Sequence, residues 1–294
     1  MTNSDRRIYI GIDGGGSGSR ARLVDGSGRL LGTATGRPAN MATDAVAAWG
    51  AVMGLCDDAL QQAGLSRETL DRTVAGIALA GLGQSRERRR AETLAHPFRS
   101  RALASDAEAA CLGAHNGGDG GIVIAGTGSI AVAMVGGRTT RIGGWGFPIS
   151  DHGSGAWLGL EAVREGLLAH DGLRPEGTLA RAVMGRFRGD PEAVVAFRSR
   201  AGPGDYATMA PMVVDAAAAG DPSAKALLRD SGRMLGLMAS RLVSAGAERL
   251  SIVGGLADPL TPFLPAAIQG TLAPALGDGV DGALILAHRI VGRS

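Results

Sequence analysis

The chain has 294 residues, enough for two domains of ordinary size, and its 45% of hydrophobic and 3% of aromatic residues predict a core of Ala, Val, Leu and Ile. Its 48 glycines follow no repeating period, which excludes a collagen and argues against disorder. The formal net charge is only +2, and one short basic cluster, Arg86 to Arg90, lacks the aromatic platforms and extended basic surface of nucleic-acid binding, so we predict no nucleic-acid partner.

Residues 8–24 give the first clear pattern. An apolar strand ends at Asp13, the glycine-rich run Gly14 to Gly18 follows, and apolar alternation resumes at Ala21 and Leu23. This pattern predicts a strand, a tight turn and a second strand. The turn presents backbone N–H groups with little side-chain cover, which suits phosphate oxygens, and Asp13 stands where it can hold Mg²⁺ directly or through water.

The alternative is a hairpin turn with no ligand, because glycine-rich turns join many strands. The run is not a P-loop, since no Gly-Lys-Ser/Thr follows, and not a dinucleotide fingerprint, since a strand-like pattern comes next and not a helix. A carboxylate at the end of an apolar strand is costly unless something binds it. Asp13 therefore favours phosphate binding.

The rest of the first half alternates helices with strands. A strand is predicted over residues 29–34, a helix from Thr43 or Asp44 to Ala63, a strand over 73–80, a helix over 86–94, a strand over 102–104 and an Ala-rich helix through 114. The inward residues expected of the first helix are Val46, Trp49, Val52, Met53, Leu55 and Leu60. This order predicts a mixed sheet flanked by helices.

The opening pattern recurs after residue 120. Strands are predicted over residues 121–125, 130–135 and 138–142, with a glycine turn at Gly126 to Ser129. The repeat indicates an internal duplication, and we expect domains at residues 1–115 and 116–294, each offering a phosphate turn to a cleft between them. Helices are predicted over 156–169, 178–187, 191–199, 206–219 and 223–245, then a strand over 250–253 and a final helix over 283–290 that packs back on the N-terminal domain.

The cysteines and apolar segments bear on the compartment. Cys56 and Cys111 lack paired spacing, which predicts free buried thiols and neither a disulfide framework nor a zinc site. The first apolar strand is too short for a signal sequence, and no apolar run reaches membrane-spanning length. We expect a cytoplasmic protein with no membrane partner.

Four motifs now stand in order: Asp13 with its glycines, Ser105-Asp106, the turn at residues 126–129, and Gly254-Gly255. This series resembles the actin, heat-shock ATPase and sugar kinase superfamily. The stretches at residues 111–116 and 147–156 are similar to the branch shared by bacterial glucosamine kinases, N-acetylglucosamine kinases and the ATPase subunit of benzoyl-CoA reductase. The resemblance spans nearly the whole chain and implies an α/β fold of two duplicated ribonuclease-H-like (actin-like ATPase) domains, each a mixed sheet flanked by helices, with a cleft between them.

The resemblance also implies ATP and Mg²⁺ as cofactors. The phosphates would be held by residues of the two glycine turns, with Asp13 organising Mg²⁺ or the attacking geometry. The residues are Asp13, Gly14, Gly15, Gly16, Ser17, Thr127, Gly128 and Ser129. Phosphoryl transfer mainly requires such clamping, since the developing charge lies on oxygens. Gly254 and Gly255 would let adenosine approach the backbone, the alternative being a helix-start turn. Arg20 is either an electrostatic aid or an ordinary exposed residue.

Asp106 is the expected general base, which would take the proton of a sugar hydroxyl as the phosphoryl group arrives. It follows a short strand and opens a helix, so an N-cap role for Ser105 or Asp106 is the competing interpretation, and the resemblance favours catalysis.

The resemblance implies sugar contacts as well. They involve Asn40, Asp106, Gly126, Thr127 and Asp151. Asn40 and Asp151 lie in Gly/Pro-rich loops, where a turn-stabilising role is the alternative, and we expect the neighbouring His152 to support its loop and not to catalyse.

The predicted activity is ATP-dependent phosphorylation of the 6-hydroxyl of D-glucosamine, with N-acetylglucosamine kinase as the nearest alternative. A C2 ammonium would favour a nearby carboxylate and an acetamide a small apolar pocket with an amide partner, and the sequence leaves both open. An ATPase activator of a radical dehydratase or reductase is more distant, because Cys56 and Cys111 lack the spacing of an iron–sulfur site. A sugar-sensing regulator would need a DNA-binding module, for which we see no room before Ile8. A homodimer is expected from the family alone.

Overall fold

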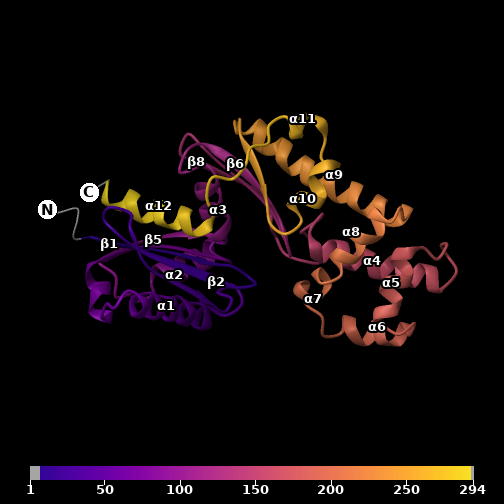
Figure 1. Ribbon diagram of the computed structural model, residues 1–294, viewed down its shortest axis with the longest axis horizontal. Coiled ribbons are helices and arrows are strands. Elements are labelled where there is room, and N and C mark those ends of the chain that lie inside the picture. Colours follow the sequence, from indigo (N-terminus) through magenta and orange to yellow (C-terminus); the bar gives the residue numbers. More distant parts are fainter. Residues whose placement is uncertain (1–6, 293–294) are drawn as a thin grey trace. The chain divides into compact units, whose positions relative to one another are not determined.

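The computed structural model describes residues 7–292 and divides into two compact units (Figure 1). Unit 1 comprises residues 7–120, 136–139 and 274–292, and unit 2 comprises residues 121–135 and 140–273. The predicted division fell between residues 115 and 116. The chain enters unit 2 at residue 121, passes back through unit 1 at residues 136–139 and returns to unit 1 finally at residue 274, so the final helix belongs to the same unit as the first strand.

Unit 1 is built on a five-stranded sheet in the order β3-β2-β1-β4-β5. β2 pairs antiparallel with β1 and β3, whereas β4 lies parallel to β1 and β5 lies parallel to β4. Tight turns join the antiparallel strands, and the parallel ones are joined through helices, as parallel pairing requires. The strands are β1 Ile8–Gly14, β2 Ser19–Asp25, β3 Leu30–Gly36, β4 Thr73–Leu79 and β5 Ser100–Ser105.

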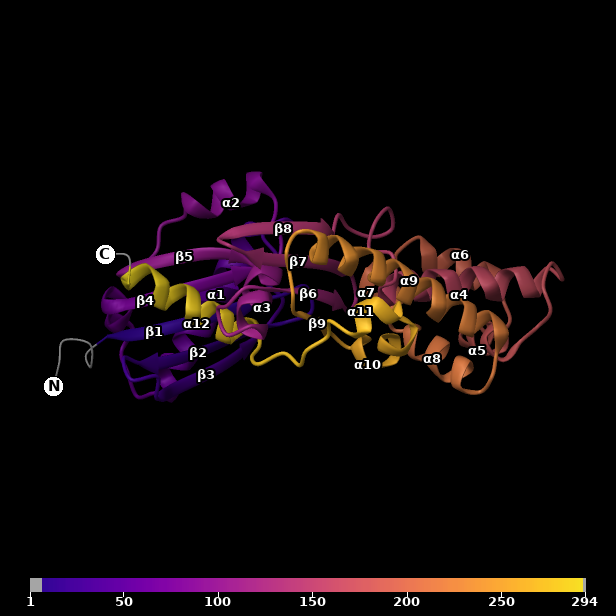
Figure 2. The same cartoon turned by 90° about the horizontal axis from the view of Figure 1, so that it is seen from above.

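Helices cover both faces of this sheet because side chains alternate along β1. Ile10 and Ile12 belong to the core shared with α1 (Ala45–Gln62), whereas Tyr9 packs with Ala287 of α12 (Gly279–Val291). Figure 1 shows α1 and α12 on opposite faces, with α12 beside α3 (Asp106–Ala114). The short helix α2 (Ser85–Glu92) lies beside the edge strand β5 (Figure 2), and the 3-10 helix η2 (Arg67–Arg72) precedes β4. Asp13, four residues after Tyr9, shares the α12 face of β1.

Helix α12 packs close to the sheet and to α3 because glycines, which have no side chain, stand at the points of contact. A Cβ on Gly76 of β4 would lie 1.8 Å from the Ala283 carbonyl oxygen, and a Cβ on Gly282 of α12 would lie 1.8 Å from the Ala109 carbonyl oxygen of α3. Any larger residue at either position would push α12 away from the sheet or from α3. The N-terminus of α12 is thereby held close to the carboxyl end of β1.

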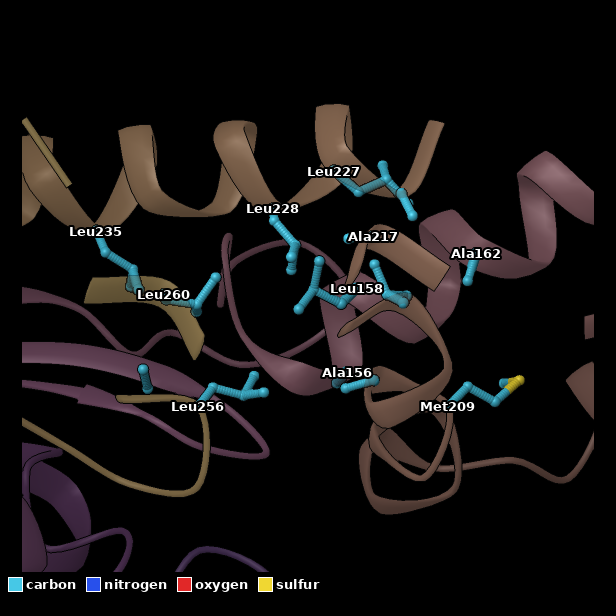
Figure 3. Close-up of a cluster of buried hydrophobic side chains, with 14 of the residues drawn as sticks. Ala156, Leu158, Ala162, Met209, Ala217, Leu227, Leu228, Leu235, Leu256 and Leu260 are labelled. Carbon is cyan, nitrogen blue, oxygen red and sulfur yellow. The ribbon is translucent and has the colours of Figure 1, made fainter. Parts of the chain in front are cut away.

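Unit 2 contains a four-stranded sheet in the order β8-β7-β6-β9, with β9 parallel to β6. Fully buried Leu158, Leu235 and Leu260 come from three different helices and converge in its core (Figure 3). The strands are β6 Gly120–Ala125, β7 Ser129–Val135, β8 Arg138–Gly143 and β9 Leu250–Val253. The helices are α4 Gly155–His170, α5 Thr178–Arg186, α6 Pro191–Arg198, α7 Pro203–Ala207, α8 Ala210–Ala218, α9 Pro222–Ser244, α10 Ala257–Leu260, η3 Thr261–Phe263 and α11 Ala266–Gln269.

The predicted α/β architecture of two mixed sheets flanked by helices is confirmed, and the details differ in three places. Val46 was expected to face inward and is 78% exposed, because α1 turns an alanine-rich stripe that includes Ala48 and Ala51 toward the sheet. The helix predicted over residues 206–219 is two helices, α7 and α8. The final helix begins at Gly279, earlier than expected, because Asp278 caps it. Along residues 7–292, no helix combines the length and apolar character needed to cross a membrane.

Candidate active site

Three predicted site residues of unit 1 lie at one edge of its sheet. The carboxyl ends of the parallel strands β1, β4 and β5 are aligned at this edge. Asp13 is the penultimate residue of β1, and Asp106 directly follows β5. Asn40 joins them because its backbone bridges to Ala80, just beyond β4. The carboxyl ends of parallel strands are where α/β sheets bind ligands, so the sheet gathers these residues where a substrate is expected.

The turn between β1 and β2 is open at its tip. The Gly15 amide donates to the Gly18 carbonyl at 2.9 Å and closes the turn. A Cβ on Gly16 would meet no atom within 4 Å, and Ser17 is exposed. Gly14 differs, since its Cβ would lie 2.6 Å from Leu79 Cδ2. Packing alone requires Gly14, while phosphate binding at the tip stays a prediction.

Asp13 is a largely buried carboxylate paired with an arginine. Arg20 Nη2 donates to Asp13 Oδ2 at 3.0 Å, and Arg20 Nη1 donates to Asp278 Oδ2 at 3.1 Å. Burial raises the pKa of Asp13 above its ordinary value, the hydrogen bond and charge of Arg20 oppose that rise, and the negative charge of Asp278 adds to it. A cation beside Asp13 would offset both burial and the neighbouring charge.

Ser105, and not Asp106, caps α3. The Ser105 hydroxyl accepts a hydrogen bond from the Glu108 amide at 3.1 Å, and the Glu108 carboxylate accepts one from the Ser105 amide at 2.7 Å. The Glu108 carboxylate also forms an ion pair with Arg88. Asp106 occupies the first helical position, where its Oδ1 accepts the Ala107 amide at 2.9 Å. The competing N-cap interpretation therefore applies to Ser105 alone. A carboxylate in the first turn of a helix is stabilised by the helix dipole.

Asn40 stabilises a turn with part of its side chain. Its Oδ1 accepts the Ala42 amide at 2.9 Å, and its carbonyl oxygen accepts the Asp44 amide at 3.2 Å. The side-chain NH₂ group takes no part in these bonds and carries two donors. The side-chain oxygen of Asn40 thus stabilises the turn, and its NH₂ group is the part left to the predicted sugar contact.

The predicted phosphate turn of unit 2 lies against the start of α4. The Gly126 amide donates to the Gly128 carbonyl at 3.1 Å. The Gly126 and Thr127 carbonyls accept the amides of Gly155 and Ala156 at 2.8 and 3.0 Å. This turn is fixed by the N-terminus of a helix, and the Thr127 side chain at its tip is exposed.

Asp151 joins the loop before α4 to the same turn. It has a φ of 61°, in the left-handed region that few residues other than glycine adopt. Its carboxylate lies against the turn, since a Cβ on Gly128 would lie 2.8 Å from its Oδ2. Burial raises the pKa of Asp151 even though the nearby backbone amides of Gly146, Ser129 and Phe147 lower it. Asp151 packs against the turn of residues 126–129, and its sugar contact, like phosphate binding at this turn, stays a prediction.

The remaining residues predicted to bind the nucleotide are Ser129, Gly254 and Gly255, and the structure shows the surroundings of each. The Ser129 hydroxyl donates to the His152 carbonyl at 2.8 Å, so its side chain serves the loop. Gly254 has a φ of 105°, and its Cβ would lie 2.5 Å from the Ala125 carbonyl oxygen, so the packing of β9 on β6 requires a glycine there. A Cβ on Gly255 would meet no atom within 4 Å. Gly254 is thus required by packing, and the adenosine contact of both glycines stays a prediction.

Sequence reasoning missed the contribution of the C-terminal segment. Asp278 caps α12 and reaches Arg20, and a Cβ on Gly279 would lie 2.6 Å from Asp13 Oδ2. The Asp-x-x-Asp spacing of Asp278 and Asp281 is a helix-start signal that was available. The pairing of Arg20 with a residue 258 positions away was not.

Two units with mixed sheets, and an acid and a glycine turn at the end of the first strand, define the actin-like ATPase and sugar kinase class. A ROK family glucokinase from Streptomyces griseus shares this fold, with a TM-score of 0.53 over 96% of this chain and 99% of that one at 19% identity. The chain belongs to the BadF/BadG/BcrA/BcrD ATPase family, whose model matches residues 10–283.

More similar relatives are amino-sugar kinases. The glucosamine kinase GspK of Vibrio cholerae is 38% identical over 281 residues, which cover 96% of each chain. A protein from Chromobacterium violaceum, provisionally assigned as an N-acetylglucosamine kinase, has a TM-score of 0.89 at 37% identity over 96% of this chain and 99% of its own. An N-acetylmuramic acid/N-acetylglucosamine kinase of Clostridium acetobutylicum is 32% identical over 146 residues, 48% of this chain and 47% of that protein.

Proposed function

We propose that the protein is an ATP- and Mg²⁺-dependent amino-sugar kinase that transfers the γ-phosphoryl group to the 6-hydroxyl of D-glucosamine. The position of Asp106 carries this proposal. Its carboxylate lies at the carboxyl edge of the sheet that also bears Asp13, and Ser105 performs the capping that Asp106 would otherwise provide. Membership of an ATPase family and 38% identity to a glucosamine kinase support it.

In this mechanism Asp106 acts as the general base. Its carboxylate takes the proton of the sugar 6-hydroxyl while that oxygen bonds to the γ-phosphorus, and the bond from the γ-phosphorus to the bridging oxygen breaks to release ADP. The open tips of the two glycine turns, at Gly16 and Thr127, bind phosphate oxygens through backbone amides. Asn40 donates its side-chain NH₂ group to a sugar oxygen, and Asp151 accepts a hydrogen bond from a sugar hydroxyl or ammonium.

Asp13 fits a role in holding Mg²⁺. Mg²⁺ keeps several waters and takes one or two carboxylates together with phosphate oxygens, so a dedicated cluster of protein ligands is not needed. Residues 7–292 contain no cluster of three His, Cys, Asp or Glu side chains placed to hold a metal ion. The bound ion would neutralise charge on the phosphates. Asp13, with its raised pKa and neighbouring Asp278, gains from a cation nearby.

The choice of amino sugar rests on the relatives and on charge. Glucosamine carries an ammonium at C2, which pairs with a carboxylate such as Asp151, while an acetamide needs an apolar pocket and an amide partner. N-acetylglucosamine is the alternative, favoured by the fold match to the C. violaceum protein. Initial rates of ADP formation with D-glucosamine, N-acetylglucosamine, N-acetylmuramic acid and D-glucose distinguish these substrates. Activity on none of them would refute the proposal.

The role of Asp106 is tested with the substitution Asp106→Asn. We expect turnover to fall by about 10²–10⁴-fold, because general-base catalysis contributes that much, with little change in stability. The control is Asp44→Asn, which makes the same chemical change at the exposed N-cap of α1, where asparagine caps equally well. Near-normal turnover of a folded D106N protein would refute the assignment.

The radical-enzyme activator is not favoured, because both cysteines are buried. Cys56 is fully buried in α1 and Cys111 is 1% exposed in α3, where its Sγ donates to the Gly120 carbonyl at 3.5 Å. Burial raises the pKa of Cys56 to about 12, whereas a cluster ligand must be a thiolate. Protein purified without air should therefore be colourless, and a brown preparation that contains iron would reverse this conclusion.

A further inference from the structure

Arg20 bridges the candidate metal-site acid to a helix cap. One guanidinium nitrogen donates to Asp13 Oδ2 at 3.0 Å and the other donates to Asp278 Oδ2 at 3.1 Å. The Arg20 side chain is 51% exposed, and an exposed ion pair of this kind stabilises a fold little. The arrangement is therefore better explained by what it does to Asp13 than by stability.

Asp278 is itself held in place from several sides. Its Oδ1 accepts the Val280 and Asp281 amides at 3.0 Å, which caps α12. Arg22, two residues along β2 and hence on the same face as Arg20, donates to Asp278 Oδ2 at 2.8 Å and also pairs with Asp281. Arg20 thus reaches Asp13 from an anchored carboxylate and not as a free side chain.

The cluster is negative and leaves one oxygen of Asp13 available. Three carboxylates, Asp13, Asp278 and Asp281, face two guanidinium groups, Arg20 and Arg22. Among the side-chain hydrogen bonds of residues 7–292, Arg20 is the one donor to the Asp13 carboxylate, and it binds Oδ2. The Oδ1 oxygen keeps its full acceptor capacity for a cation or for water bound to a cation.

We propose that Arg20 is the positioning residue of the metal site: anchored by Asp278, it holds Asp13 by Oδ2 and presents Oδ1 to the Mg²⁺ that accompanies ATP. This inference rests on the proposed function, since it takes Asp13 as the metal-site acid. It assigns Arg20 no contact with the sugar and no share in proton transfer.

A positioning role and a purely electrostatic role for Arg20 predict opposite changes in Mg²⁺ affinity when Arg20 is removed. If Arg20 acted only as a nearby positive charge, its removal would strengthen Mg²⁺ binding. If Arg20 positions Asp13, its removal frees the carboxylate to rotate and weakens metal binding, typically by about 10–100-fold for a partner that orients a metal ligand. The direction of the change therefore separates the two roles.

The experiment measures Mn²⁺ binding by electron paramagnetic resonance, in the presence of a non-hydrolysable ATP analogue. For Arg20→Gln we expect the Mn²⁺ dissociation constant to rise by about 10-fold or more. The matched control is Arg29→Gln, which removes the same charge from an exposed pair with Asp25 and touches neither Asp13 nor Asp278, and it should stay within about 3-fold of wild type. The Mn²⁺ dissociation constant of Arg20→Lys should lie between those of wild type and Arg20→Gln, because one ammonium cannot bridge two carboxylates in the planar manner of a guanidinium.

A double substitution tests the anchor. Asp278→Asn keeps the cap of α12 but loses the charge that holds Arg20, so Mn²⁺ binding should weaken in the wild-type background and not weaken further in R20Q. Thermal melts and analogue binding in EDTA, both near wild type, show that the variants are folded.

An R20Q protein that binds Mn²⁺ as tightly as wild type, or more tightly, would overturn the inference while leaving the proposed kinase intact. A wild-type protein with no Mn²⁺-dependent nucleotide binding would overturn both. The measurement uses no sugar and no turnover, so failure to identify the sugar does not affect it.

Discussion

Replacing Gly279 with alanine tests whether the catalytic geometry needs Asp13 in its place beside α12. The new Cβ would lie 2.6 Å from Asp13 Oδ2, 2.7 Å from Cγ and 3.0 Å from Oδ1. Ordinary contacts of this kind are about 3.5–4 Å, so the carboxylate must move by about 1 Å. Asp13 is short and held by Arg20, and it cannot rotate away without losing that hydrogen bond.

The effect on stability should be small because two contributions oppose each other. Alanine is favoured over glycine in a helix by up to about 1 kcal/mol. Loss of the pair between Arg20 and Asp13, whose arginine is 51% exposed, costs about 1 kcal/mol at most. A shift of about 1 Å in a positioned group reduces turnover by about 10²-fold. We therefore expect Gly279→Ala to be folded and slow.

The assay pairs urea unfolding with steady-state turnover on D-glucosamine across a Mg²⁺ titration. The control is Gly54→Ala in α1, where a Cβ would meet no atom within 4 Å, so stability should rise by about 0.5–1 kcal/mol and turnover should not change. A folded G279A protein that keeps turnover within about 3-fold of wild type would refute the reasoning, because a 1 Å displacement would then be harmless.

Two further predictions concern the fold of unit 2. Burial by itself raises the pKa of Asp221, but backbone amides including those of Ala224 and Leu179 outweigh it, so the folded pKa lies below the ordinary value. Asp221→Asn should therefore lower the free energy of unfolding by about 1–2 kcal/mol at pH 7. Measured by urea unfolding, this difference between variant and wild type should shrink as pH falls below about 4, and a difference independent of pH would contradict the prediction. Leu235→Ala, at a fully buried position of the core in Figure 3, should cost about 2–5 kcal/mol, whereas Leu237→Ala, 53% exposed on the same helix, should cost under about 0.5 kcal/mol; equal losses would contradict the packing assigned here.

The sequence by itself determined the elements whose signals are local. The apolar strand that ends at Asp13, the glycine turn after it and the repeat of this pattern at residues 120–143 are all present as strands and turns. The Ser105-Asp106 pair was correctly placed between a strand and a helix. These features follow from side-chain alternation and from glycine chemistry within a few residues, which no distant contact has to supply.

The tertiary structure decided which side chains meet. Val46 matched the helical period but is exposed, because the alanines of α1 allow the helix to sit closer to the sheet on another face. Asp151 lies against Gly128, 23 positions earlier in the sequence, only because the loop before α4 folds back on the turn of residues 126–129. Arg20 meets Asp278 across 258 positions of sequence, only because α12 returns to the first sheet. Periodicity records the neighbours of a residue along the chain, whereas burial, pKa and ion pairing depend on neighbours brought together by packing.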